Sequence, residues 1–216
     1  MFGLVSGLYE KATEKPEIPL MLVGADGVGK TTVLELLRRS ETRESFLGFM
    51  KSPEETVLSA LPSTRPTVGL NMARLSFSDS NMVIWDLGGG KSVRSLWRNY
   101  FHDTFGLCLV ASEDRGIDDT LEILENLMIE PSLQGKPVLI IINIKNTIPC
   151  ESKLGVPEIT SPPVIDWPGK LNLQKWDDRS IRCVSLSTLN PQILRKAFSW
   201  LLKESKDFRI NHKISN

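Results

Sequence analysis

Apolar residues in this chain gather in six stretches, each of the length of one β-strand, and several are rich in β-branched side chains. The stretches cover residues 18–23, 72–77, 82–86, 106–111, 138–142 and 181–185. Between them, segments 32–39, 118–128 and 191–201 place apolar residues at helical spacing. Strands that alternate with helices predict an α/β fold, with a doubly wound, mostly parallel six-stranded sheet and helices on both faces.

The ends of the chain differ from its body in composition. Residues 1–15 form the first segment, where apolar residues at positions 1, 4, 5 and 8 predict an amphipathic helix. A helix this short needs a surface to lie on, either the domain itself or a membrane interface. Residues 16–205 form one domain, in which the polar segment 41–65 predicts a long mobile connection. Residues 206–216 are polar and predict a disordered tail.

Composition excludes several classes of protein. Lys plus Arg and Asp plus Glu both number 26, so the net charge indicates no nucleic-acid partner. Three scattered cysteines form neither a disulfide framework nor a metal motif, which favours a reducing compartment. No apolar run approaches the roughly 20 residues that span a bilayer.

The segment Gly24–Thr31 matches the phosphate-loop pattern G-x-x-x-x-G-K-[ST]. A strand-like run precedes it and a helical pattern follows it, which is the context that the pattern requires. In such a loop, successive backbone N–H groups and the helix N-terminus form a concave anion site. Lys30 would reach the outer phosphates of a nucleotide, and the Thr31 hydroxyl would bind Mg²⁺. A glycine-rich turn without this function is the weaker interpretation.

A second glycine-rich segment follows Asp86. Asp86 closes a predicted strand and precedes Leu87 and three glycines, 88–90. An Asp at a strand end, paired with a phosphate loop, is suited to hold the water shell of Mg²⁺. The glycines would let the backbone approach a γ-phosphate. Alone this segment would indicate a simple turn, but beside a phosphate loop it indicates a nucleotide site.

The order and spacing of four motifs resemble the ADP-ribosylation factor branch of the small GTPases. They are the phosphate loop, T-V-G-x-N at 67–71, W-D-x-G-G at 85–89 and L-W-R-N-Y-F at 96–101. The opening L-V-S-G-L-Y at 4–9 and S-L-W at 95–97 look most like the Arf-related protein subgroup. The resemblance covers nearly the whole chain, with its specific motifs before residue 101, and implies the phosphate-loop small-GTPase fold.

This resemblance implies a binding site for GTP or GDP with Mg²⁺, in which Thr31 and Thr67 are the metal ligands. Leu70, Trp85 and Tyr100 would form an effector surface, although without the family such a cluster would be interpreted as packing. The implied nucleotide-binding residues are Gly24, Asp26, Gly27, Val28, Gly29, Lys30, Thr31, Thr32, Thr67, Asp86, Gly89, Gly90, Asn143, Asn146, Ser185 and Leu186.

The resemblance also implies partners and a location. Exchange factors and effector proteins would bind the domain, and residues 1–15 would reach a membrane surface or a membrane receptor. Phe2 stands where N-myristoylation needs glycine, whereas an acetylated Met1 suits the Arf-related subgroup. The expected location is cytoplasmic, peripherally associated with Golgi membranes, with a role in vesicle traffic and protein transport.

Three positions depart from the family pattern. Gly90 replaces the glutamine that orients the attacking water, so no intact catalytic residue is expected and hydrolysis should be weak. Ile144 replaces the lysine that packs over the base, and Asn146 replaces the aspartate that accepts two N–H bonds from guanine. Two hypotheses follow: a nucleotide-dependent switch in Golgi and vesicle traffic, or a pseudo-GTPase scaffold that recruits partners without a GTPase cycle.

Overall fold

A computed structural model describes residues 15–46, 67, 69–77, 79–144, 166–187 and 191–214. The six strands are β1 (Glu17–Val23), β2 (Leu70–Ser76), β3 (Asn81–Leu87), β4 (Gly106–Ser112), β5 (Val138–Ile144) and β6 (Ile181–Ser187). The α-helices are α2 (Lys30–Phe46), α4 (Asp118–Met128), α5 (Trp167–Lys170) and α6 (Pro191–Ile214). Four 3₁₀ helices complete this part of the chain: η1 (Lys91–Tyr100), η2 (Glu113–Arg115), η3 (Pro131–Leu133) and η4 (Leu173–Lys175).

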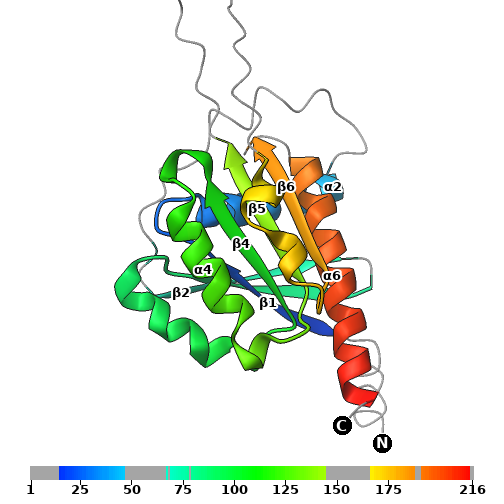
Figure 1. Ribbon diagram of the computed structural model, residues 1–216. Coiled ribbons are helices and arrows are strands. Elements are labelled where there is room, and N and C mark those ends of the chain that lie inside the picture. The colour runs from blue at the N-terminus through cyan, green and yellow to red at the C-terminus, as the bar shows by residue number, and fades with distance from the viewer. Residues whose placement is uncertain are drawn as a thin grey trace, which may run out of the picture.

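The strands form one six-stranded sheet in the order β2-β3-β1-β4-β5-β6. All neighbours are parallel except β2 and β3, which form an antiparallel hairpin. Figure 1 shows α4 on one side of the sheet and α2 on the other, where α2 contacts α6. The predicted α/β class, the mostly parallel sheet and the helices on both faces are therefore confirmed.

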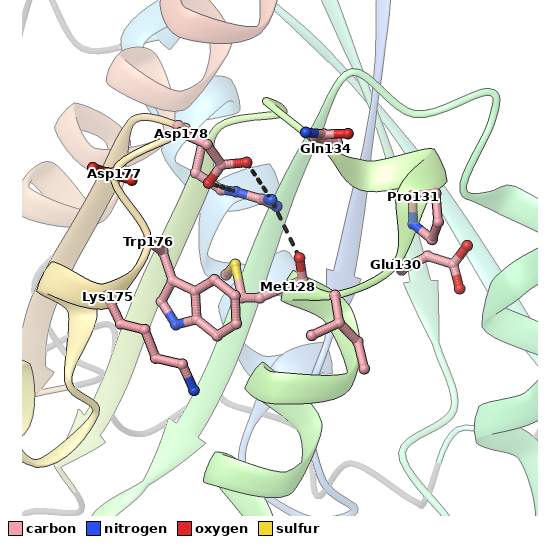
Figure 2. A pocket seen from close by; sticks show the side chains of 10 residues that line it. Met128, Glu130, Pro131, Gln134, Lys175, Trp176, Asp177 and Asp178 are labelled. Carbon is pink, nitrogen blue, oxygen red and sulfur yellow. Dashed lines mark hydrogen bonds and ion pairs between the residues drawn. The ribbon is translucent and has the colours of Figure 1, made fainter.

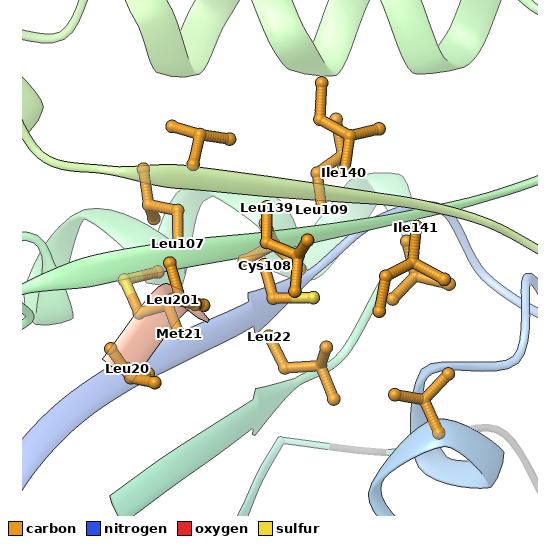
Figure 3. Packing of buried hydrophobic residues seen from close by; sticks show 14 of the residues in the cluster. Leu20, Met21, Leu22, Leu107, Cys108, Leu109, Leu139, Ile140, Ile141 and Leu201 are labelled. Carbon is orange, nitrogen blue, oxygen red and sulfur yellow. The ribbon is translucent and has the colours of Figure 1, made fainter. Parts of the chain in front are cut away.

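The core lies on both faces of β1, β4 and β5. Figure 3 shows side chains of these three strands, among them Leu22, Cys108 and Ile140, together with Leu201 of α6. All residues of β4 are buried, because this strand has neighbours on both edges and helices over both faces. A sheet held this firmly provides a rigid edge where its parallel strands end.

Two helices are longer than the sequence pattern predicted. Helix α2 continues to Phe46, into the segment expected to be a mobile connection. Helix α6 continues to Ile214, so the prediction of a disordered tail after Ser205 was wrong.

Long-range contacts explain why the tail of α6 is helical. Lys206 forms an ion pair with Asp79 in the β2–β3 turn. Arg209 donates from Nη1 to the Glu17 carbonyl at 2.8 Å, and its guanidinium lies 5.1 Å from the centre of the Phe105 ring. These partners are remote in sequence, so a local pattern does not show them.

Several predictions fall outside the described residues. These are the N-terminal helix, most of the segment 41–65 and the position of Asn146. Within the part of the chain that the structure describes, no helix is long and apolar enough to cross a membrane.

Candidate nucleotide-binding site

The phosphate loop connects the carboxyl end of β1 to the start of α2, as the sequence predicted. Gly24, Gly27 and Gly29 have φ angles of 142°, 70° and 102°, a region that side chains rarely adopt. A Cβ atom built on Gly24 would lie 2.1 Å from the Val110 carbonyl oxygen of β4. Glycine is therefore required here both for backbone conformation and for close packing.

Lys30 lies folded over this loop. Its side chain is buried, and Nζ donates to the carbonyls of Gly24 at 3.0 Å and Ala25 at 2.7 Å. Burial lowers the pKa of Lys30, while the carboxylates of Asp86 and Asp26 act in the opposite direction. A desolvated ammonium held by two carbonyls is poised to transfer its hydrogen bonds to an anion in the loop.

Three oxygen-bearing side chains meet beside the loop. Thr31 Oγ1 lies 2.9 Å from Thr67 Oγ1 and donates to Asp86 Oδ2 at 3.0 Å. The other carboxylate oxygen, Asp86 Oδ1, is buried and has no hydrogen-bond partner among the described residues. Burial raises the pKa of Asp86, opposed by the Thr31 hydrogen bond and by Lys30.

A buried oxygen of this kind needs a partner. Two hydroxyls and a carboxylate form a hard oxygen donor set, which fits Mg²⁺ and the water molecules that it retains. Thr31 and Thr67, the predicted metal ligands, are thus adjacent, and Asp86 lies behind Thr31 as expected for a residue that holds the water shell.

Gly89 and Gly90 follow Asp86 at the edge of the site. A Cβ atom built on Gly89 would lie 2.5 Å from the Ala25 carbonyl, so the two loops are in close contact. Gly90 has φ −60° and ψ 140°, which any residue adopts. Among the described residues, a Cβ atom on Gly90 would meet only Val93 Cγ2 within 4 Å, at 3.9 Å. The described residues leave space for a larger side chain, so packing against them does not explain the glycine.

The base-reading end of the site is described in part. Asn143, at the end of β5, is buried and donates from Nδ2 to the Val28 carbonyl at 2.9 Å, which braces the phosphate loop. Ile144 pairs in register with Ser187 of β6. Asn146 and the Leu186 side chain lie outside the described residues, while Ser185 is exposed on β6. The structure therefore brings Asn143 to the loop and leaves the other predicted base contacts untested.

The remaining predicted residues lie on the loop and on the strands beside it. Asp26 and Gly27 are exposed on the rim of the loop, and Val28 is buried below it. Thr32 lies in the first turn of α2 and is half-buried.

The predicted effector residues lie together at the β2–β3 side of the sheet. The rings of Trp85 and Tyr100 are 5.4 Å apart, centre to centre, and tilted by 57°. Leu70 is exposed at the start of β2, as are Met72 on the same strand and Leu96 in η1. Exposed apolar residues beside a nucleotide site are consistent with a protein-binding surface.

A pocket of about 380 Å³ lies elsewhere, between the end of α4 and the segment that precedes β6. Figure 2 shows its lining, which includes Met128, Trp176 and Asp178. Asp178 is already paired with Arg179, whose Nη2 also donates to the Met128 carbonyl at 3.3 Å. None of the predicted site residues lines this pocket, so we place the candidate site at the phosphate loop.

Sequence reasoning missed two arginines at the site. Arg94 in η1 donates from Nε to the Gly89 carbonyl at 3.0 Å. The guanidinium of Arg115 in η2 lies over Gly27, where a built Cβ atom would be 2.6 Å from it. Arg94 lies one helical turn after the glycine segment, so its place in the sequence could have indicated it. Arg115 is far from the phosphate loop in sequence, and the end of β4 brings it to Gly27.

The strand order, the phosphate loop after β1 and the Thr31–Thr67–Asp86 cluster together define a phosphate-loop protein with the small-GTPase fold. Comparison with a solved structure agrees. The chain matches the Arl6 (BBS3) small GTPase of Trypanosoma brucei, solved with the nucleotide analogue GppNp, with a TM-score of 0.59 and 17% identity over 88% of this chain and 98% of that one.

Sequence comparisons establish the family. The model of the ADP-ribosylation factor family matches residues 5–205, so the chain belongs to this family. ADP-ribosylation factor-related protein 1 of Bos taurus is 28% identical over 94% of this chain and 92% of its own. ADP-ribosylation factor-like protein 2 of Arabidopsis thaliana is 31% identical over 94% and 95%, respectively. The resemblance to this family and to its Arf-related members is confirmed.

Proposed function

We propose that this protein is a GTP-binding switch of Golgi and vesicle traffic that hydrolyses GTP slowly. The observation that carries the proposal is the meeting of Thr31, Thr67 and Asp86 beside the buried Lys30. Thr67 belongs to the segment that leads into β2, whereas Thr31 begins α2. A site that joins these two segments can report on the nucleotide that it holds.

Each residue has a separate part in this proposal. Lys30 would exchange the Gly24 and Ala25 carbonyls for phosphate oxygens, and the loop N–H groups would hold the phosphates. Thr31 and Thr67 would hold Mg²⁺, with Asp86 behind them. When bound, Mg²⁺ neutralises the charge of the phosphates.

Slow hydrolysis follows from Gly90. Lys30, together with the residues that would hold Mg²⁺, can stabilise negative charge on the phosphates. Gly90, however, has no side chain to orient a water molecule. Loss of an orienting group reduces the rate of such a step by about 10²–10⁴.

Base preference follows from Asn146. An amide offers one acceptor and a donor to a base edge that presents two N–H groups, so guanine should bind less tightly than in the family. Asn146→Asp should lower the Kd for GTP at least about tenfold, the effect of one charge-assisted hydrogen bond. The Kd for XTP should rise in the same variant, because xanthine has a carbonyl at C2 that pairs with an amide and not with a carboxylate. If the unmodified protein and Asn146→Asp each bound GTP and XTP equally well, this assignment would be contradicted.

We further propose that residues 1–15 bind a membrane surface or a membrane receptor, and that Leu70, Trp85 and Tyr100 bind effectors. Exchange factors would act on the same side of the domain. Support comes from the apolar pattern of residues 1–8 and from the exposed Leu70 beside the Trp85–Tyr100 pair. The apolar pattern favours peripheral association with a membrane, and the resemblance to the Arf-related members is the ground for proposing the Golgi.

The second candidate is a pseudo-GTPase scaffold of the same shape. Three substitutions favour it: Gly90 at the catalytic position, with Ile144 and Asn146 at the base. Such a protein would use the same effector surface without a cycle. The two candidates differ in whether nucleotide binds and exchanges.

Mass spectrometry of the nucleotide released from purified protein tests the proposal, followed by exchange into mant-GDP after Mg²⁺ chelation. The switch predicts about one equivalent of GTP or GDP that exchanges with added nucleotide, and Lys30→Ala and Thr31→Asn should each reduce it sharply. The melting temperature should fall with the nucleotide, since a ligand of the native state stabilises by mass action. A purified protein that contains no nucleotide and binds none when it is added would contradict the switch and leave only the scaffold hypothesis.

A further inference from the structure

The glycine loop, defined here as residues 88–90, is held from one side by η1. Trp97 Nε1 donates to the Gly88 carbonyl at 2.9 Å, and Arg94 Nε donates to the Gly89 carbonyl at 3.0 Å. The Val93 amide donates to the Gly90 carbonyl at 3.0 Å. Three successive glycines have unusual backbone freedom, so these bonds restrict a segment that would otherwise sample many conformations.

Arg94 connects this loop to α4. Its Nη1 and Nη2 atoms donate to Oδ1 and Oδ2 of Asp119, both at 2.8 Å. The two side chains are 16% and 31% exposed, which limits screening by solvent. The Arg94 hydrogen bonds lower the pKa of Asp119, which keeps its carboxylate ionised at neutral pH. A bidentate pair fixes the orientation of the guanidinium as well as its position.

The position of Gly89 matters because it lies against the phosphate loop, with a built Cβ atom 2.5 Å from the Ala25 carbonyl. A shift of the glycine loop would change the distance from its backbone N–H groups to the outermost phosphate of a bound nucleotide. The two inner phosphates would instead be held mainly by the N–H groups of the loop 24–31, which follow from its own glycine conformations.

We propose that Arg94 and Asp119 form a clamp that fixes the glycine loop and thereby sets the preference of the site for a nucleoside triphosphate over a diphosphate. Arg94 is a positioning residue, since it acts through Gly89. This inference rests on the proposed nucleotide-binding function. It also makes α4 part of the response to the third phosphate, because Asp119 belongs to the first turn of that helix.

The test uses Asp119→Asn in the full chain, with Kd values for mant-GppNHp and mant-GDP measured by fluorescence titration. The neutral amide removes the charge-assisted bidentate pair, so the Kd for the triphosphate analogue should rise at least about tenfold, while that for GDP should change less than about twofold. Asp118→Asn is the matched control, because it removes one exposed carboxylate from the same helical turn without affecting the clamp. Asp119→Glu should restore part of the preference.

Arg94→Lys provides a second route should Asp119→Asn fail to fold, as checked by thermal melting. Lysine keeps the charge but cannot bind the Gly89 carbonyl and both Asp119 oxygens in this geometry. The same loss of triphosphate preference is expected. Equal loss for both nucleotides, or no loss, would overturn the clamp and leave the proposed function standing. A wild-type protein that binds neither nucleotide would overturn both.

Discussion

Gly90 stands where the glycine loop meets η1, with an ordinary backbone conformation and no described residue close enough to block a larger side chain. A glutamine therefore fits here without backbone strain. Gly90→Gln should raise the rate of single-turnover GTP hydrolysis at least about tenfold, because it restores a group that can orient water. Release of phosphate from preloaded protein measures this rate, with Gly90→Ala as the control for the added Cβ. Brisk hydrolysis by the unmodified chain would show that another residue has this role.

Lys136 provides a test of pH dependence away from the site. Its Nζ is buried and donates to the Phe101 carbonyl at 2.7 Å. Burial lowers its pKa to about 8, against a smaller effect of Asp103. In the unfolded chain its pKa is about 10.4, so between these values the unfolded state binds more protons and the free energy of unfolding rises with pH.

From about pH 7.5 to about pH 9.5, the wild type should gain about 1–2 kcal/mol in free energy of unfolding relative to Lys136→Met. Denaturant titrations at both pH values measure this difference. Lys196→Met, on an exposed position of α6, is the control and should show no such gain. A difference that is constant across this range would mean that Lys136 keeps an ordinary pKa.

At the scale of elements, the end of α6 contributes to the stability of the domain. Besides the contacts of Lys206 and Arg209, Phe208 packs on Gly135, where a built Cβ atom would lie 3.3 Å from the ring. Deletion of residues 206–216 should lower the free energy of unfolding by about 1–3 kcal/mol, mainly from the loss of the Arg209–Glu17 hydrogen bond and of ring packing.

Thermal melting measures this loss, which corresponds to a fall of about 2–4 °C in Tm per kcal/mol for a domain of this size. Deletion of residues 215–216, beyond the end of α6, is the control and should leave Tm unchanged. An unchanged Tm after the longer deletion would mean that α6 is stabilised only by the residues before Lys206.

At the scale of the whole molecule, we expect that membrane association can be removed without unfolding the domain. The core of the described residues begins at Ile18, and Lys15 anchors the start of this region by donating to the Phe77 carbonyl at 2.9 Å. Deletion of residues 1–14 keeps Lys15 and should leave circular dichroism and Tm nearly unchanged.

The same deletion should move the protein from membranes to the soluble fraction, because it removes the apolar face at positions 1, 4, 5 and 8. Sedimentation with Golgi-derived membranes measures this, and Leu4→Asp in the full chain is a matched variant with the same expected result. Continued sedimentation of both variants would place the membrane contact elsewhere in the domain.

Local patterns determined the elements of this fold. Apolar runs and helical spacing identified the six strands and the three main helices, because these patterns express how each element buries one or both faces. The phosphate loop was also local, since the positive φ angles of Gly24, Gly27 and Gly29 belong to the loop itself. Its chemistry follows from neighbouring N–H groups and one lysine, so sequence alone was sufficient.

Only the tertiary structure decided which distant residues meet. Asp86 reaches Thr31 because β3 lies beside β1 in parallel, so the carboxyl ends of both strands share one edge of the sheet. The Arg94–Asp119 clamp and the helical end of α6 likewise depend on partners from other elements. Ion pairs of this kind leave no periodic signal in a sequence, because charged side chains are common at exposed positions and the folded arrangement alone selects their partners.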